Sequence, residues 1–362
     1  MLELVNVSKR VGNEAHIDDI SMRLERGTLN VLLGPTLAGK TTLMRLMAGL
    51  ERPTSGDVRV DGASVLDVPV QRRNVAMVYQ QFINYPSMTV YDNIASPLRL
   101  ARIDAASIDR RVRRAAELLR LTPFLDRLPL SLSGGQQQRT ALARAIVKDA
   151  GLVLLDEPLA NLDYKLREEL REELPKIFAE SGAIYVYATT EPSEALLLGG
   201  NTATLSQGRL TQFGPTIDVY RRPVDLVTAR TFSDPPMNVV HGTKAGHVLE
   251  LEGGGRIPFP PELADIADAG YLIGFRAHHL SLTPSAPDSV ALSARVNVVE
   301  ITGSESFVHL DYAGQQWVML APGIHDFETG RIVDVHLDIH QLIIFDHTGR
   351  TVAGHERVAK VG

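Results

Sequence analysis

The sequence predicts an α/β domain followed by a small all-β domain. Up to about residue 235, short apolar runs alternate with longer segments of helical period, a pattern typical of a mostly parallel sheet covered by helices. After residues 233–238, which read SDPPMN, strand-like pieces are separated by Gly, Pro and Asp turns, as in a barrel-like β domain. Because Pro235 and Pro236 cannot continue a helix, we place the domains at residues 1–235 and 236–362.

The composition is that of an ordinary two-domain globular protein, with 44% hydrophobic and 22% charged residues in 362. No run of about eighteen apolar residues and no basic leader before an apolar core occurs, so we expect a cytoplasmic protein. The lack of cysteine excludes disulfides, thiolate metal sites and a cysteine nucleophile. The net charge of −6 offers nucleic acid no overall attraction. The basic stretch 109–120 has the spacing of an amphipathic helix with a solvated face, so we expect no nucleic-acid partner.

A phosphate-binding loop is predicted at residues 34–42. The stretch GPTLAGKTT matches GxxxxGK[ST] and lies between an apolar strand-like run and a helical segment, the context that this motif requires. Backbone N–H groups of such a loop and the positive end of the following helix face the phosphates. Lys40 would reach the terminal phosphates, and Thr41 would place its hydroxyl on Mg²⁺. The residues expected to hold the nucleotide are Gly34, Pro35, Thr36, Leu37, Ala38, Gly39, Lys40, Thr41 and Thr42.

Two adjacent acids end a predicted strand at residues 152–157, which read LVLLDE. Because side chains alternate along a strand, Asp156 and Glu157 should point to different sides. One can then face a metal ion while the other faces a water molecule. Two such acids alone would more often form a polar turn, but next to a phosphate loop we expect Asp156 to hold Mg²⁺ and Glu157 to orient the attacking water.

The stretch LSGGQQQRTALARAIV at residues 132–147 resembles the ATP-binding-cassette ATPases. Their LSGGQ signature is present as Leu132, Ser133, Gly134, Gly135 and Gln136. A serine hydroxyl and two glycines opening a helix make a second surface that can read phosphate. In that family the signature contacts the ATP held by the opposite subunit, so the resemblance implies a head-to-tail dimer. It also implies an α/β P-loop NTPase fold with a helical subdomain at about residues 88–150.

The same resemblance assigns further positions. Gln80 in VYQQF lies at the position that contacts Mg²⁺, the water and the membrane subunit, and Asp163 in LANLD lies in the loop that crosses the dimer seam. Beyond residue 236, IGFRAHHLSL and VVEITGSESFVHL look like the oligonucleotide-binding-fold-like regulatory domain of sugar and polyol importer ATPases. The resemblance implies ATP and Mg²⁺ as cofactors. It implies membrane permeases, an extracytoplasmic solute-binding protein and a peripheral position on the cytoplasmic face of the inner membrane.

Three positions depart from the family pattern. Thr190 stands where the family usually carries a catalytic His, and a hydroxyl lacks the reach and the possible positive charge of imidazole. Val11 stands where an aromatic ring usually stacks on adenine, so adenine binding should be weaker. Leu37 occupies a position where many relatives have a small residue. We therefore expect impaired hydrolysis at this chain's own site.

Because the signature and the remaining site residues are intact, the sequence favours a heterodimer with one active and one weakened site. A homodimer with slow turnover is the alternative, and a mainly regulatory, non-hydrolysing subunit is a second. The phosphate loop and the stretch YATTEPSEAL, at residues 187–196, look like one of the two ATPase subunits of bacterial glycerol importers. We expect His16 on the surface rather than at adenine, and no metal site from His278, His279 and His340, whose spacing matches no metal motif.

Overall fold

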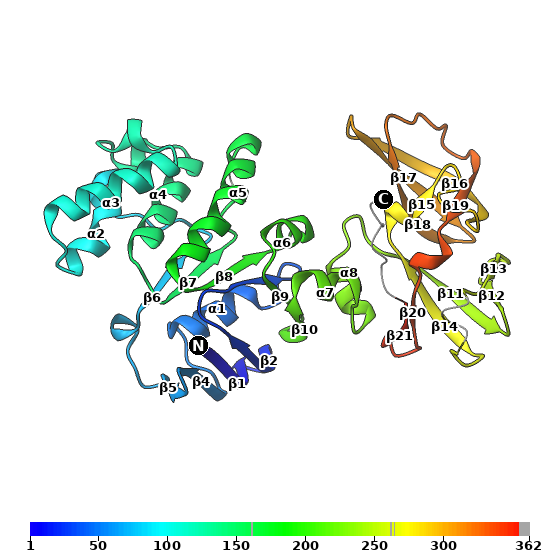
Figure 1. Ribbon diagram of the computed structural model, residues 1–362, viewed down its shortest axis with the longest axis horizontal. Helices are drawn as coiled ribbons and strands as arrows, with labels where there is room; N and C mark the ends of the chain where they lie inside the picture. Colours follow the sequence, from blue (N-terminus) through cyan, green and yellow to red (C-terminus); the bar gives the residue numbers. More distant parts are fainter. Residues whose placement is uncertain (161, 261–262, 264, 355–362) are drawn as a thin grey trace. The chain divides into compact units, whose positions relative to one another are not determined.

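The computed structural model describes residues 1–160, 162–260, 263 and 265–354 (Figure 1). Its chain divides into two compact units, Met1–Thr216 and Ile217–Gly362. This division lies earlier in the chain than residue 235, because the segment 217–235 packs on strands near residue 345. Leu226 N–H donates to the Gly349 carbonyl at 2.8 Å, and Ala229 is buried in one cluster with Phe345. The limits 1–235, 236–362 and 88–150 stay predictions.

The first unit is built on a six-stranded sheet in the order β10-β9-β3-β8-β7-β6. The strands are β3 (Leu29–Leu33), β6 (Val75–Val78), β7 (Leu152–Asp156), β8 (Ile184–Thr189), β9 (Asn201–Ser206) and β10 (Arg209–Pro215). All neighbouring pairs are parallel except β10 with β9. Every residue of β7 and β8 is buried, as expected of strands covered on both faces. The carboxyl ends of β3, β7 and β8 therefore meet at one edge of the sheet.

A second, antiparallel sheet in the order β2-β1-β4-β5 completes the core of this unit. Its strands are β1 (Leu2–Val11), β2 (Glu14–Leu24), β4 (Ser55–Val60) and β5 (Ala63–Ser64). Apolar residues of β1 and β2 share one buried cluster with the helix α1 (Lys40–Ala48) and with strands of the parallel sheet. Val7, Leu43 and Val186 are fully buried in this cluster. The phosphate loop, which precedes α1, is thereby fixed between the two sheets.

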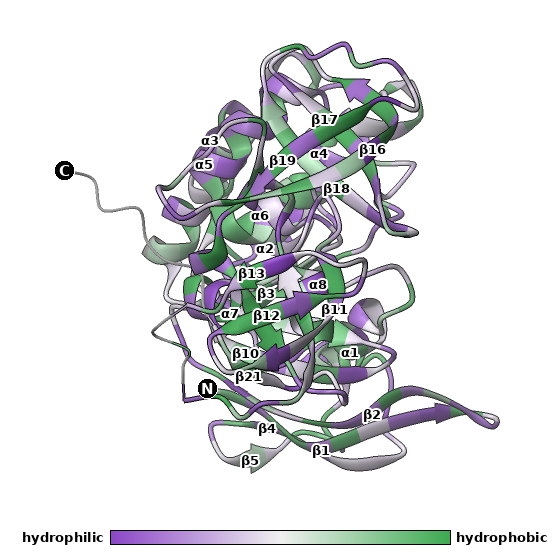
Figure 2. Cartoon of the chain, turned by 90° about the vertical axis from the view of Figure 1, so that its right-hand side faces the viewer, coloured by the Kyte–Doolittle hydropathy of each residue, from purple (hydrophilic) through white to green (hydrophobic). Residues whose placement is uncertain are grey.

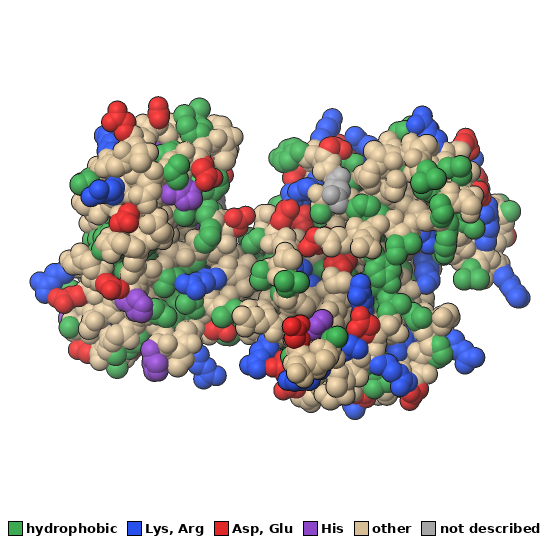
Figure 3. All heavy atoms as spheres, turned by 180° about the vertical axis from the view of Figure 1, so that it is seen from behind, with side chains coloured by type: hydrophobic (Ala, Val, Ile, Leu, Met, Phe, Trp, Pro, Cys, Tyr) green, Lys and Arg blue, Asp and Glu red, His purple; other side chains and the backbone are tan. Residues whose placement is uncertain are grey.

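Three helices lie between β6 and β7 in the chain: α2 (Val90–Leu100), α3 (Ala105–Leu118) and α4 (Gly134–Val147). The basic stretch 109–120 forms much of α3, and Val112 and Ala115 are buried, which confirms the predicted amphipathic helix. Within this helix Arg113 bonds Asp109 at 2.8 Å. Acidic and basic side chains are also interspersed over the face of the molecule that Figure 3 shows. Short 3-10 turns occur at Val70–Arg72, Thr122–Phe124 and Pro129–Ser131.

The remaining helices of this unit are α5 (Tyr164–Ser181), which follows β7, and α6 (Pro192–Leu198), which follows β8. The start of α6 differs from a threonine-capped helix. Its N-cap residue is Glu191, without a side-chain cap, and Pro192 occupies the first turn. The Glu191 N–H instead donates to the Thr189 hydroxyl at 3.0 Å. Thr190 is therefore not used as a cap.

The second unit contains two antiparallel sheets around one apolar core, which confirms the predicted all-β domain. One sheet holds β11 (Asn238–Ala245), β12 (Val248–Leu251), β13 (Arg256–Pro258), β14 (Gly270–Phe275), β20 (Ile343–Phe345) and β21 (Thr351–Ala353). The other holds β15 (Leu280–Ser281), β16 (Val290–Ile301), β17 (Glu305–Tyr312), β18 (Gln315–Pro322) and β19 (Ile332–Leu337). Burial alternates along β17, where Val308, Leu310 and Tyr312 are buried while Glu305, His309 and Asp311 are half-buried. The strand carries both hydrophobic and hydrophilic residues (Figure 2). The 3-10 turns Ala277–His279 and Ile339–Gln341 and the helices α7 (Thr216–Arg221) and α8 (Leu226–Thr231) complete the described elements.

The centre of this β core is aromatic. Trp317 is fully buried, with its ring stacked on Tyr312 at 4.2 Å between centroids and edge-on to Phe275 at 5.0 Å. Such pairs add about 0.5–1.5 kcal/mol beyond their buried area. Tyr312 is also held through its hydroxyl, which accepts the Gly255 N–H at 3.1 Å. The cluster therefore joins both sheets of the domain.

Candidate nucleotide-binding site

A cavity of about 710 Å³ lies at the carboxyl end of the parallel sheet of the first unit. It brings together the phosphate loop, the segment after β6 and the ends of β7 and β8. The predicted residues that line it are Thr36, Leu37, Ala38, Gly39, Lys40, Thr41, Thr42, Gln80, Glu157 and Thr190. Residues that lie far apart in the sequence therefore border one space, as the motifs predict.

The phosphate loop takes a conformation that only small or strained residues allow. Gly39 has φ of 100°, and a Cβ there would lie 2.9 Å from the His16 carbonyl oxygen. A Cβ on Gly34 would lie 2.4 Å from the Leu205 carbonyl oxygen. Leu37 also has a left-handed φ, 67°, which is costly for a residue with a Cβ. Its side chain is 95% exposed, so packing does not compensate for this strain.

The pocket floor, as we call Lys40, Thr41 and Asp156, is buried or half-buried, and each of the three has a hydrogen-bond partner; Asp156 does not itself line the cavity. The Lys40 ammonium donates to the carbonyl oxygens of Gly34 at 2.7 Å and Pro35 at 3.0 Å. The Thr41 hydroxyl donates to Asp156 Oδ2 at 2.7 Å. Burial lowers the pKa of Lys40, and the nearby carboxylates of Glu157 and Asp156 oppose this shift. Gly34 and Pro35 are thus bound to Lys40 without lining the cavity.

The two acids after β7 point to different partners, as strand alternation predicts. Asp156 bonds Thr41, whereas Glu157 Oε2 accepts a hydrogen bond of 2.9 Å from the Gln80 side chain. Burial is the main cause that raises the pKa of both carboxyl groups. Glu157 has φ of 46°, uncommon for a residue with a side chain. Its carbonyl oxygen accepts a bond from Gln138 of α4 at 3.3 Å, which helps to hold this strained position.

The pocket rim, as we call Val11, Leu37 and Thr190, is exposed. Thr190 lines the cavity directly after β8. Val11 is 54% exposed and does not line the cavity, although its pairing partner Glu14 does. All three departures from the family pattern therefore lie at the surface of the site or beside it. The floor residues Lys40, Thr41 and Asp156 keep the residue types that the motifs require.

The signature residues and Asp163 lie outside this cavity. Ser133 caps α4, because its hydroxyl accepts the Gln136 N–H at 3.3 Å and its own N–H donates to the Gln136 side chain at 2.9 Å. Asp163 caps α5 by accepting the Leu166 N–H at 3.0 Å. The predicted site residues outside the lining are Ser133, Gly134, Gly135, Gln136 and Asp163, together with Val11, Gly34, Pro35 and Asp156. These residues do not contribute to the cavity of their own chain.

Five lining residues were not predicted as site residues: Glu14, Ala15, His16, Gln207 and Gly208. Glu14, Ala15 and His16 begin β2, and Gln207 and Gly208 form the turn between β9 and β10, which approaches the phosphate loop through a backbone bond. Gly208 N–H donates to the Ala38 carbonyl at 3.1 Å, and Asp18 N–H donates to the Gly208 carbonyl at 2.9 Å. His16 is exposed, as expected, but it also borders the cavity. Because these contacts are made by the backbone, no side-chain motif in the sequence predicts them.

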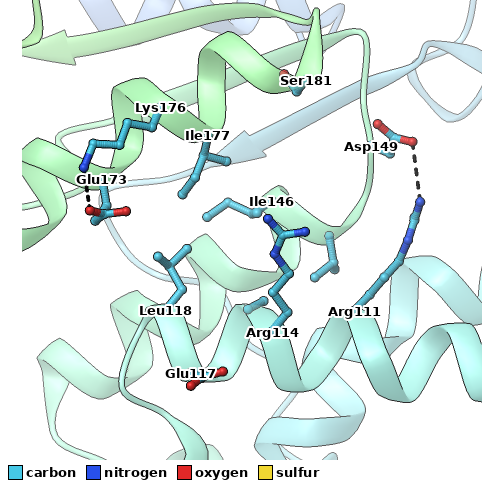
Figure 4. Close-up of a pocket in the computed structure, with 12 residues that line it drawn as sticks. Arg111, Arg114, Glu117, Leu118, Ile146, Asp149, Glu173, Lys176, Ile177 and Ser181 are labelled. Carbon is cyan, nitrogen blue, oxygen red and sulfur yellow. Dashed lines mark hydrogen bonds and ion pairs between the residues drawn. The ribbon is translucent and has the colours of Figure 1, made fainter.

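A second cavity of about 600 Å³ lies between α3, α4 and α5 (Figure 4). It has an apolar floor that includes Leu118, Ile146 and Ile177, and it contains no residue of the phosphate loop. Lys176 bonds Glu173 at 2.8 Å, and Arg111 lies 3.7 Å from Asp149. Its charges are thus largely satisfied within the rim, and we do not assign it the nucleotide.

The floor fits a hard cation beside phosphate. Mg²⁺ prefers oxygen ligands and usually takes only one or two from the protein, with phosphate and water completing its coordination. Thr41 and Asp156 supply such a hydroxyl and carboxylate side by side. Across the described residues, no group of three or more His, Asp or Glu side chains could hold a metal by itself. His278 and His279 stack edge to face at 4.4 Å, outside any such group.

Comparison with known proteins agrees with this geometry. Residues 17–160 match the family described as ABC transporter, and residues 273–345 match the TOBE domain. The trehalose/maltose import ATP-binding protein of Thermococcus litoralis is 38% identical, over 96% of this chain and 98% of its own length. The sn-glycerol-3-phosphate import ATP-binding protein of Rhizobium etli is 37% identical, over 96% and 98%.

A solved structure extends the comparison to the assembly. The dimeric, post-hydrolysis ATP-binding cassette MJ0796, bound to ADP and Pi, is 27% identical with a TM-score of 0.55. It covers 60% of this chain, and 99% of the cassette is matched. Among the residues that the structure describes, no helix is long and apolar enough to cross a membrane.

Proposed function

The chain belongs to the ATP-binding proteins of ABC transporters, and we propose that it powers the import of a sugar or polyol. The observation that carries this proposal is the similarity of nearly the whole chain, including the β domain, to import ATP-binding proteins. The protein is then a transporter ATPase that docks on membrane permeases at the cytoplasmic face of the membrane. An extracytoplasmic solute-binding protein would deliver the solute.

The geometry of the floor supports the proposed roles of the site residues. Lys40 would exchange its two loop carbonyls for terminal phosphate oxygens. Thr41 and Asp156 would hold Mg²⁺, which when bound neutralises charge on the phosphates. Glu157 would orient the attacking water once its 2.9 Å hydrogen bond with the Gln80 side chain opens to admit that water.

The position of the signature supports a head-to-tail dimer. Ser133 and Gly135 open α4 away from their own chain's cavity, and a Cβ on Gly134 would meet nothing within 4 Å. A surface of this kind can receive the phosphates of ATP held by a second cassette. The solved cassette MJ0796 is itself dimeric. We propose that this chain completes its partner's ATP site in this way.

The rim supports two unequal ATP sites. Thr190 has a short, exposed side chain where an imidazole would reach the attacking water, and Val11 offers no ring to adenine. A partner with both groups would form a fully equipped site with the signature of this chain. We therefore favour a heterodimer over a slow homodimer. Among the polyols and sugars we favour glycerol as the solute, because the phosphate loop and residues 187–196 resemble an ATPase subunit of glycerol importers.

Substitution of Ser133 tests this function in the assembled transporter. Ser133→Arg would block the signature without touching the cavity of its own chain. Uptake of labelled glycerol into vesicles should be lost, because the partner's site lacks its second face. Ser131→Arg, two residues earlier in an exposed turn, is the matched control and should transport normally. Normal uptake by Ser133→Arg would contradict the proposed completion of the partner's site.

A further inference from the structure

Two acids and two arginines form a network behind Thr190. The acids Glu191 and Glu194 lie at the start of α6, and Arg167 and Arg171 lie on α5. Arg171 reaches Glu191 at 3.1 Å and Glu194 at 3.2 Å. Arg167 reaches Glu191 at 3.3 Å. Arg171 also pairs with Glu168 of its own helix at 2.6 Å, so charges from two helices meet behind the end of β8.

The burial of this network indicates that its charges fix the positions of nearby residues rather than stabilise the fold. The side chains of Arg171 and Glu194 are only 11% and 5% exposed. Glu194 Oε2 also accepts hydrogen bonds from the Thr189 hydroxyl at 2.7 Å and the Tyr187 hydroxyl at 3.1 Å, so it is bonded to the last residues of β8. Yet Nε of both arginines is buried without a hydrogen-bond partner in the part of the chain described. Since apolar side chains of the same volume often stabilise a protein as well as a buried ion pair, this cost is better explained by positioning.

One of these arginines, Arg167, also holds the chain after β7. Arg167 donates to the Ala160 carbonyl at 3.0 Å, and the Ala160 N–H points back to the Glu157 carbonyl at 3.4 Å. Glu157 is the residue with the left-handed φ, so this turn needs external support. Arg167 therefore bonds, with one guanidinium, the turn that follows Glu157 and the residue that follows Thr190.

We propose that Arg167 and Arg171 are positioning residues that fix Glu157 and Thr190 relative to each other across the nucleotide cavity. Both of these residues line the cavity, and the network joins the segments that carry them. Neither arginine lines it, so they act through the two segments. This inference rests on the proposed role of Glu157, since the spacing matters only if a water is oriented there.

Arg167 offers the cleaner test, because its side chain is 23% exposed and less costly to replace than that of Arg171. In the purified chain without its partner, where every ATP site is this chain's own, Arg167→Gln should lower kcat for ATP by about tenfold to a hundredfold while KM stays unchanged, since misplacement of about 1 Å costs this much. Arg167→Lys keeps the charge but cannot bond Ala160 and Glu191 together, so it should restore only part of kcat. Lys176→Gln is the matched control on the same helix, because Lys176 bonds Glu173 at the other cavity (Figure 4).

Hydrogen exchange of the full chain gives a second measurement that does not require turnover. In Arg167→Gln, the exchange rate should rise in both segments, residues 157–160 and 189–194. In Lys176→Gln, the exchange rate should rise in neither segment. Unchanged kcat and unchanged exchange in both segments would overturn the inference. The variant Glu157→Gln distinguishes failure of this inference from failure of the proposed function. If the proposed role of Glu157 is wrong, the purified Glu157→Gln chain hydrolyses ATP normally, whatever the effect of Arg167→Gln.

Discussion

The floor of the nucleotide pocket and its rim differ in how strongly each is held. On the floor, Thr41 and Asp156 bond each other at 2.7 Å, and Lys40 is buried with two carbonyl partners. On the rim, Leu37 and Thr190 are exposed, and Leu37 even carries backbone strain. The comparison teaches that binding of phosphate and completion of the reaction are separable. A chain can keep the first while altering the second.

The largest expected effect comes from breaking the floor. Lys40→Ala removes the charged group that would neutralise the terminal phosphates, so ATP hydrolysis by the assembled transporter's corresponding site should fall by about a thousandfold. Titration with a fluorescent ATP analogue and phosphate release would measure binding and turnover. Lys176→Ala should leave both unchanged. Equal loss in the two variants would show that general destabilisation, not the pocket floor, is responsible.

Restoring the rim should have the next largest effect. Thr190→His supplies an imidazole at the end of β8, where a positioned acid–base group contributes about a hundredfold to kcat. Steady-state hydrolysis by the purified chain, with and without its partner, would measure the gain. Thr190→Ser keeps a hydroxyl and should show none. If the chain already turns over rapidly and Thr190→His changes nothing, the idea of a weakened site is wrong.

An aromatic ring at Val11 should give a smaller gain, in affinity for ATP. Val11→Tyr offers adenine a stacking surface, and an aromatic pair contributes about 0.5–1.5 kcal/mol, a factor of about 2 to 12 in affinity. Val11→Leu adds apolar volume without a ring and is the control. Calorimetric titration with ATP would measure both. A similar gain with leucine would indicate simple hydrophobic contact rather than stacking.

The smallest expected effect concerns the strain at Leu37. Its left-handed backbone costs about 1 kcal/mol, and glycine removes this cost at an entropic penalty in the unfolded chain, which leaves a net gain of about 0.5 kcal/mol. Leu37→Gly should therefore raise the free energy of unfolding slightly, as measured in denaturant. Leu37→Ala retains a Cβ and should not. A gain of equal size in both would point to the exposed leucine side chain rather than the backbone.

The sequence predicts the floor better than the surroundings for a physical reason. Residues 34–42 and the acids at 156 and 157 act through side chains and glycines whose spacing is fixed by a strand, a loop and a helix, so their pattern is local. Gly208 meets the phosphate loop through a backbone bond to Ala38, a contact between distant segments that leaves no pattern in the sequence. The alternation of apolar runs likewise predicts both fold classes. The packing of residues 217–235 on the β domain depends on contacts with residues near 345, which no local pattern encodes.

The capping box at Ser133 has a practical consequence for mutagenesis of the signature. In that box the Ser133 oxygen acts as an acceptor, so its hydroxyl hydrogen remains available to an anion arriving from outside. Alanine would delete the cap and this donor together, and any loss of function would be ambiguous. Aspartate retains a good cap but presents negative charge to a phosphate. A serine-to-aspartate exchange would therefore preserve the helix start while repelling nucleotide, and it would separate folding from recognition at this single oxygen.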